Sequence, residues 1–194
     1  VCSSDLNIPL LGFVGRFVFQ KGVDLIVETI PRILEQYDVQ FVLIGTGESE
    51  LSSKVEALVK QYPDQVFAYI GYSEELAHLL EAGSDMFLMP SRYEPCGLNQ
   101  LYSLRYGTPP IVRDTGGLAD SVIDATTDTL ANGTATGFKF SDISSESLFE
   151  AIKRAIEMFH DEKIWLQLIK NGMKQDNSWQ HSALSYQKLY RAEQ

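Results

Sequence analysis

Cysteine is scarce in this sequence, which has only Cys2 and Cys96 among its 194 residues. Two cysteines allow at most one disulfide, and they exclude the closely spaced clusters that bind structural zinc or iron–sulfur groups. A reducing compartment is therefore the simpler setting, with Cys96 as a free thiol. We expect a cytoplasmic protein.

Basic residues are outnumbered: 16 Lys and Arg stand against 26 Asp and Glu, which gives a formal net charge of −10. Nucleic acids and acidic membranes bind clustered Lys and Arg, so this balance argues against both as partners. No apolar stretch approaches the roughly 18 residues that a membrane-spanning helix needs, and the first residues lack a basic segment followed by an apolar block. The sequence predicts a protein that is neither exported nor membrane-bound.

Short apolar runs alternate with helical patterns along the chain. Alternation of this kind predicts a parallel sheet with helices on both faces, which is a Rossmann-like α/β fold. The predicted strands are 9–14, 39–44, 65–70, 85–89, 110–112 and 137–140. We expect a tail or linker remnant at 1–8, a domain at 9–178 and a terminal helix at 179–194; the polar segment 124–136 is expected to be a surface excursion.

The loop that follows the run Asp85–Met89 carries the densest polar chemistry. Gly97 lies at the expected start of a helix, where unpaired backbone N–H groups bind anions. Glu94, three residues earlier, would repel a phosphate but accept hydrogen bonds from hydroxyl groups. A ligand with a phosphate at one end and a polyol at the other satisfies both; the alternative is a loop ion pair between Arg92 and Glu94.

A second cationic loop follows the first predicted strand. Arg16 and Lys21 lie there, at the carboxyl end of a parallel strand, where open α/β sheets bind ligands. A planar guanidinium and a mobile ammonium suit a diphosphate, whereas each residue taken alone is equally typical of a solvated loop.

Two other segments are less informative. The Gly45–Gly47 turn lacks the third glycine of a dinucleotide fingerprint, because position 50 is Glu, and we reject a nicotinamide or flavin site. His78 has no second histidine nearby, so we interpret it as a histidine on a helix surface with its hydrogen bonds satisfied.

The segment Arg92–Pro109, which reads RYEPCGLNQLYSLRYGTP, closely resembles the donor-site motif of bacterial glycogen synthases and plant starch synthases. Three shorter segments resemble the same family: Gly15-Arg16, Gln20–Asp24 and the turn Thr115–Asp120. The similarity runs from Pro9 to Tyr190 and covers only the carboxyl-terminal half of these two-domain (GT-B) glycosyltransferases. It implies transfer of glucose from ADP-glucose to the non-reducing end of an α-1,4-glucan with retention, the acceptor reaching the site through a missing amino-terminal domain.

The resemblance also implies roles for individual residues. It places Arg16 and Lys21 on the donor diphosphate and Glu94 on the sugar hydroxyls, and we treat these three as catalytic. The implied donor-binding residues are Gly15, Tyr72, Cys96, Gly97, Leu98, Asn99, Thr115 and Gly116. Tyr72 is expected to pack on the adenine, with an edge-of-core tyrosine as the alternative; for Thr115 and Gly116 the alternative is a plain glycine turn.

Two features bear on mechanism. Related transferases often carry a second Glu eight residues after the first, and Tyr102 stands there instead, which weakens a two-carboxylate mechanism. No Asp-x-Asp pair occurs in the sequence, so we expect no metal or other cofactor, with side-chain cations neutralising the diphosphate. The alternatives are a UDP-sugar-dependent retaining transferase and a nucleotide-sugar binding module that is inactive without its partner domain.

Overall fold

The computed structural model describes residues 8–192, apart from the side chains at positions 181, 182, 185 and 192. Most of the expected tail, residues 1–8, lies outside this range. The strands are β1 (Leu10–Val14), β2 (Gln40–Gly45), β3 (Val66–Ile70), β4 (Met86–Met89), β5 (Pro110–Arg113) and β6 (Phe138–Phe140). They agree with the six predicted strands to within one residue at each end.

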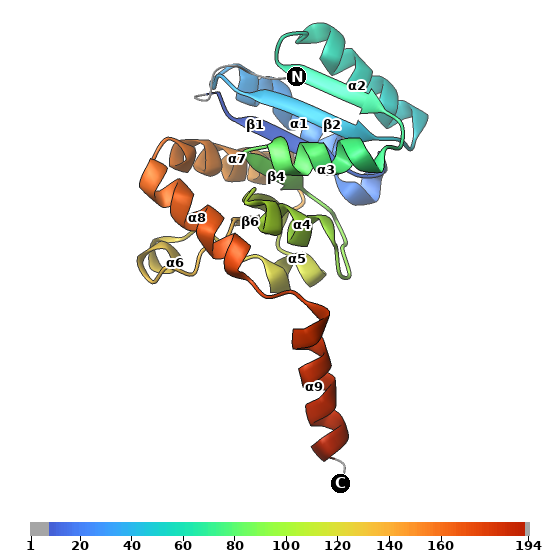
Figure 1. Cartoon of the computed structure of the whole chain (residues 1–194). Coiled ribbons are helices and arrows are strands. Elements are labelled where there is room, and N and C mark those ends of the chain that lie inside the picture. The colour runs from blue at the N-terminus through green and yellow to red at the C-terminus, as the bar shows by residue number, and fades with distance from the viewer. Residues whose placement is uncertain (1–7, 193–194) are drawn as a thin grey trace.

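All strand pairs within the described residues are parallel, and the strand order is β3–β2–β1–β4–β5–β6 (Figure 1). This order confirms the predicted Rossmann-like sheet. The chain winds outward from β1 in one direction and, after crossing to β4, in the other. The strand order therefore reverses between β1 and β4, and the carboxyl ends of these two strands border the crevice where such sheets bind ligands.

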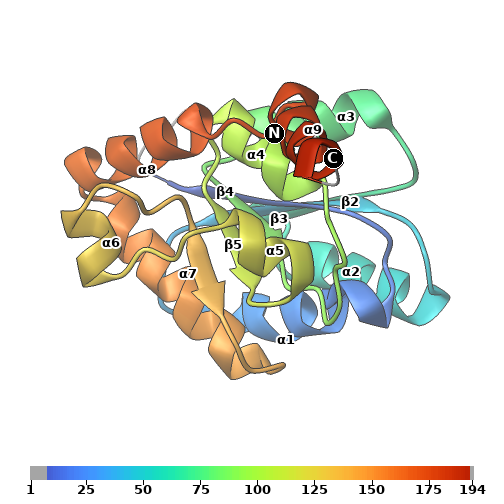
Figure 2. The ribbon, with the colours of Figure 1, turned by 90° about the horizontal axis from the view of Figure 1, so that it is seen from below.

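Helices cover both faces of the sheet. The helical segments are η1 (Phe19–Lys21, 3-10), α1 (Val23–Leu34), α2 (Ser49–Gln61), α3 (Glu74–Gly83), α4 (Asn99–Tyr106), α5 (Gly116–Ser121), α6 (Thr127–Ala131), α7 (Ser145–Phe159), α8 (Glu162–Lys174) and α9 (Trp179–Ala192). Helices α3, α4 and α8 lie on one face, and α1, α2 and α7 lie on the other (Figure 2). Strand β4 is buried throughout, as expected for a continuous apolar run in a sheet covered on both sides.

Local signals set the ends of several helices. The hydroxyl of Ser73 accepts a hydrogen bond from the Leu76 backbone N–H at 3.2 Å and caps α3. Ser144 caps α7 in the same way, and Gly107, at a φ of 86°, ends α4 in the left-handed region. The terminal helix α9 extends away from the sheet in Figure 1. Among residues 8–192, no helix combines the length and apolarity needed to cross a bilayer.

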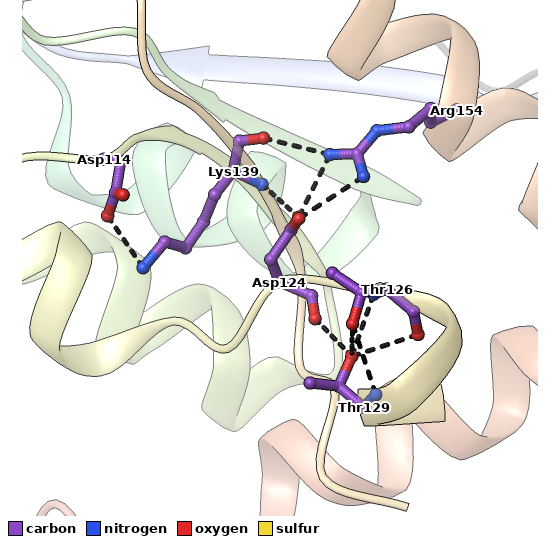
Figure 3. Close-up of polar contacts among 6 residues, drawn as sticks. All are labelled: Asp114, Asp124, Thr126, Thr129, Lys139 and Arg154. Atoms are coloured by element: carbon purple, nitrogen blue, oxygen red, sulfur yellow. Dashed lines mark hydrogen bonds and ion pairs between the residues drawn. The ribbon is translucent and has the colours of Figure 1, made fainter. Parts of the chain in front are cut away.

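The segment 124–136 is more structured than its composition predicts. It contains the short helix α6, capped reciprocally by Thr126 and Thr129, and Ala125 and Ala135 at its two ends are buried. Asp124 anchors the segment: its carboxylate accepts hydrogen bonds from the Lys139 backbone N–H at 2.6 Å and from Arg154 at 3.0 Å (Figure 3). The segment therefore lies on the surface between its buried ends, as the sequence predicts, but it is tied to β6 and α7 and contains a helix that its composition does not indicate.

We expect Asp124→Ala to lower the free energy of unfolding by about 1–2 kcal/mol, because it leaves the Lys139 N–H and the Arg154 guanidinium without their acceptor. Partial exposure of the pair keeps the loss below that of a fully buried ion pair. Urea unfolding measures the change. Asp142→Ala, at an exposed position between β6 and α7, is the matched control. Equal midpoints for the two variants would show that the anchor is dispensable.

Candidate functional site

Two loops meet where the strand order reverses. The loop after β1 runs from Gly15 to Gly22, and the loop after β4 runs from Pro90 to Leu98. At Gly22 (φ 71°) a Cβ would come within 2.2 Å of the Pro90 carbonyl oxygen, so the close approach of the two loops requires glycine at this position. The three residues that the sequence predicts to be catalytic, Arg16, Lys21 and Glu94, lie on these two loops.

Arg92 holds the two loops together. Its guanidinium forms a two-pronged ion pair with Asp24, with both N···O distances at 2.7 Å, and lies over the Phe19 ring at 3.4 Å from the centroid. It also donates a hydrogen bond to the Phe19 carbonyl at 2.6 Å. The alternative pairing of Arg92 with Glu94 is therefore wrong, because Asp24 occupies the guanidinium.

Glu94 instead pairs with Lys21, whose ammonium donates a hydrogen bond to one carboxylate oxygen. Ser91 donates to the same oxygen at 3.1 Å, and Glu94 is only 8% exposed. Two of the three residues that the sequence predicts to be catalytic are thus in direct contact. Neither of them lies in the wall of the cavity beside the start of α4.

The start of α4 carries no side-chain cap. Leu98 is the N-cap residue and offers no acceptor, and Gly97, before it, has a φ of 74°. Asn99 begins the helix and donates a hydrogen bond to the Val14 carbonyl at 3.1 Å, which fixes this end of α4 against β1. The uncapped N–H groups and the positive end of the helix dipole favour an anion here.

A cavity of about 320 Å³ opens beside this helix start. It brings together four of the predicted residues, Gly15, Arg16, Tyr72 and Asn99, which come from two loops and the start of α4. Arg16 is exposed, and within the described residues it forms no ion pair; it donates only to Gln20, at 3.5 Å. Tyr72 is 85% exposed at the cavity wall, so the alternative of an edge-of-core tyrosine is wrong.

The remaining predicted residues lie outside that cavity wall. The side chains of Cys96 and Leu98 are exposed on the loop before α4. Thr115 is the N-cap residue of α5, and a Cβ at Gly116 would meet the Glu94 carbonyl oxygen at 2.2 Å. This turn therefore packs against the loop that carries Glu94 and can support its conformation. Contact of Thr115 and Gly116 with a ligand stays a prediction.

The cavity wall includes residues that the sequence analysis missed. Glu74, Ala77, His78 and Glu81 lie on one face of α3, and Tyr102 faces them from α4. Their spacing of three and four residues is the signal that could have identified this face. His78 is partly exposed and satisfied, as expected, since its Nδ1 lies 3.3 Å from the Tyr106 hydroxyl. His78 is also part of the cavity wall. The residues next to it in sequence gave no sign of that position.

Glu81 has an unusual environment for an acidic residue. It is 2% exposed, and its Oε2 has no hydrogen-bond partner among the described residues. That oxygen lies 3.4 Å from His78 Nδ1, a contact within ion-pair range but not aligned as a hydrogen bond. Burial raises the pKa of the Glu81 carboxyl to about 7, and His78 opposes the rise.

The site therefore has two chemically different ends. A guanidinium and an uncapped helix start lie on one side, where an anion is stabilised. Aromatic side chains and a buried carboxyl lie along α3 and α4, where a flat ring with hydrogen-bond donors fits. Such a combination suits a ligand that joins a charged group to an uncharged ring.

Comparison with known proteins agrees with this geometry. The chain is 54% identical over 188 residues to the glycogen synthase of Hydrogenovibrio crunogenus and 50% identical over 185 residues to that of Thioalkalivibrio sulfidiphilus; the matches cover 97% and 95% of this chain but only 38% of each relative. The catalytic domain of starch synthase IV from Arabidopsis thaliana, solved with ADP and acarbose, superposes with a TM-score of 0.88 at 39% identity, over 99% of this chain and 40% of that one. The predicted resemblance is thus confirmed. Residues 4–175, which hold the whole sheet and the loops after β1 and β4, match the family described as glycosyl transferases group 1, and the chain belongs to that family.

Proposed function

We propose that this chain is the donor-binding half of a glycogen or starch synthase, which transfers glucose from ADP-glucose to the non-reducing end of an α-1,4-glucan with retention. The observation that carries the proposal is the convergence of Arg16, Asn99 and Tyr72 on one cavity at the point where the strand order reverses. The names of the relatives support the same activity. Because the chain spans 38% of those synthases, the glucan acceptor is assigned to the part that this sequence does not contain.

Departure of the diphosphate is the difficult step in such a transfer. Negative charge grows on the leaving oxygen, so cations and N–H groups placed there stabilise the transition state more than the bound donor. Arg16 and the N–H groups at the start of α4 are positioned for this role. Lys21 completes the set, and its position is fixed by the ion pair with Glu94.

The same ion pair defines the role that we propose for Glu94. Lys21 and Ser91 hold one carboxylate oxygen, and the other, which accepts no hydrogen bond within residues 8–192, would accept them from the donor sugar. Because the negative charge of Glu94 is compensated by Lys21, the diphosphate can bind nearby without strong repulsion. A cytoplasmic location is part of the proposal, since a reducing compartment keeps the exposed thiol of Cys96 free.

Donor binding tests the proposal directly. We expect calorimetry on this chain to show ADP-glucose binding about tenfold or more tightly than UDP-glucose, and Arg16→Ala to weaken ADP-glucose binding about tenfold by removing one charge-assisted contact. Arg105→Ala, on the far end of α4, is the control for loss of a positive charge.

The same titrations in EDTA should give an unchanged affinity, because the proposal assigns the neutralisation of the diphosphate to side-chain cations. Affinity that is lost in EDTA and restored by magnesium would contradict this assignment. Equal or tighter binding of UDP-glucose would favour the UDP-sugar alternative.

Turnover tests the role of Lys21. We expect Lys21→Ala to lower the rate of glucan elongation about 10²–10³-fold, the usual cost of losing one group that stabilises the leaving charge. The assay uses this chain joined to the remaining part of the H. crunogenus synthase, with the isolated chain expected to bind donor without turnover. Lys54→Ala is the matched control, because Lys54 forms an exposed ion pair with Glu50 on α2, outside the site. A rate within a few-fold of the unsubstituted enzyme would remove Lys21 from the mechanism.

A further inference from the structure

The proposed function gives no task to Glu81, although its carboxyl is the most buried acidic group in the cavity wall. It shares the cavity wall with residues of α3 and α4, and within the described residues its Oε2 lacks a hydrogen-bond partner. His78, the nearest cation-forming group at 3.4 Å, shares the same Nδ1 with the Tyr106 hydroxyl at 3.3 Å. A buried acceptor left without a donor is costly, and such groups are normally paired.

The place of Glu81 near the carboxyl end of α3 limits which part of a nucleotide sugar could reach its carboxyl group. Tyr72 precedes the helix, and Glu81 follows Glu74, the first residue of α3, by seven residues, or about 10 Å along the axis. The diphosphate is assigned to Arg16 and the start of α4, and an anion would be repelled by a carboxylate. Ala77 and Tyr102 provide apolar and aromatic surface beside Glu81, which suits a planar ring.

We infer that the Glu81 carboxyl accepts a hydrogen bond from the exocyclic amino group of the donor's nucleobase and thereby selects adenine over uracil. This inference rests on the proposed function and adds the residue that reads the base. Uracil has no amino group and presents carbonyl oxygens on either side of its single ring N–H, so it would place an acceptor against an acceptor. A site built to accept a hydrogen bond rejects an analogue that lacks the donor, because its buried polar group then stays unpaired.

Two ligands that differ by one group test the inference. ADP and purine riboside 5′-diphosphate differ only in the 6-amino group, and calorimetry on the whole chain compares them. We expect the unsubstituted chain to bind ADP about tenfold to a hundredfold more tightly, the range for a hydrogen bond to a charged group. Glu81→Leu removes the acceptor, so this variant should bind the two diphosphates with about equal affinity.

Glu81→Gln separates recognition from packing. Its amide keeps a carbonyl acceptor of similar size, so it should retain a preference of about threefold to tenfold, weaker because the acceptor is neutral. Glu75→Gln, exposed on the same helix and outside the cavity wall, should keep the full preference. Urea unfolding above pH 7 checks the fold: because burial raises the pKa of Glu81, a neutral side chain there removes a charge that the interior disfavours, and both variants should be at least as stable as the original chain.

The outcomes separate the inference from the proposed function. If the unsubstituted chain binds neither diphosphate, the proposed function fails. If it binds ADP but shows no preference over purine riboside diphosphate, or if Glu81→Leu keeps the preference, the donor site stands and the role of Glu81 is overturned. Loss of affinity for 2′-deoxy-ADP that disappears in Glu81→Leu would assign the carboxyl to the ribose and would also overturn it.

Discussion

The two-pronged ion pair between Arg92 and Asp24 is the interaction on which the geometry of the site depends. It joins the loop after β4 to the first turn of α1, and the Phe19 ring covers the guanidinium. Both charged groups are less than one-fifth exposed, so the pair is only weakly screened by solvent. With these loops fixed, Lys21 and Glu94 are brought into contact although 73 residues separate them in sequence.

The sheet topology explains why this contact forms where a ligand can bind. Strands β1 and β4 are neighbours, and the helices after them lie on opposite faces of the sheet, α1 on one and α4 on the other (Figure 2). Their loops therefore diverge around a crevice and need a tie across it. Arg92 and Asp24 supply that tie, while the hydrogen bond from Asn99 to the Val14 carbonyl fixes the start of α4.

The sequence predicted what depends on local pattern and missed what depends on packing between helices. The buried strands are encoded within a few residues each, and they were predicted to within one residue at each end. His78 and Glu81 became part of a cavity wall only because α4 packs against α3, and no local pattern reports that choice of partner. Asp124 was likewise read as a loop residue, since its partners Lys139 and Arg154 come from β6 and α7.

Charge in this chain is organised locally, against an overall net charge of −10. At one end of the cavity Arg16 has no carboxylate partner among the described residues, and the start of α4 adds its partial positive charge. At the other end Glu81 is buried beside a histidine. Lys21 and Glu94 lie outside the cavity wall, so the charged groups that line the cavity run from Arg16 at one end to Glu81 at the other. A ligand with an anionic group and a hydrogen-bond-donating ring is then oriented in one direction, which a uniformly cationic site could not achieve.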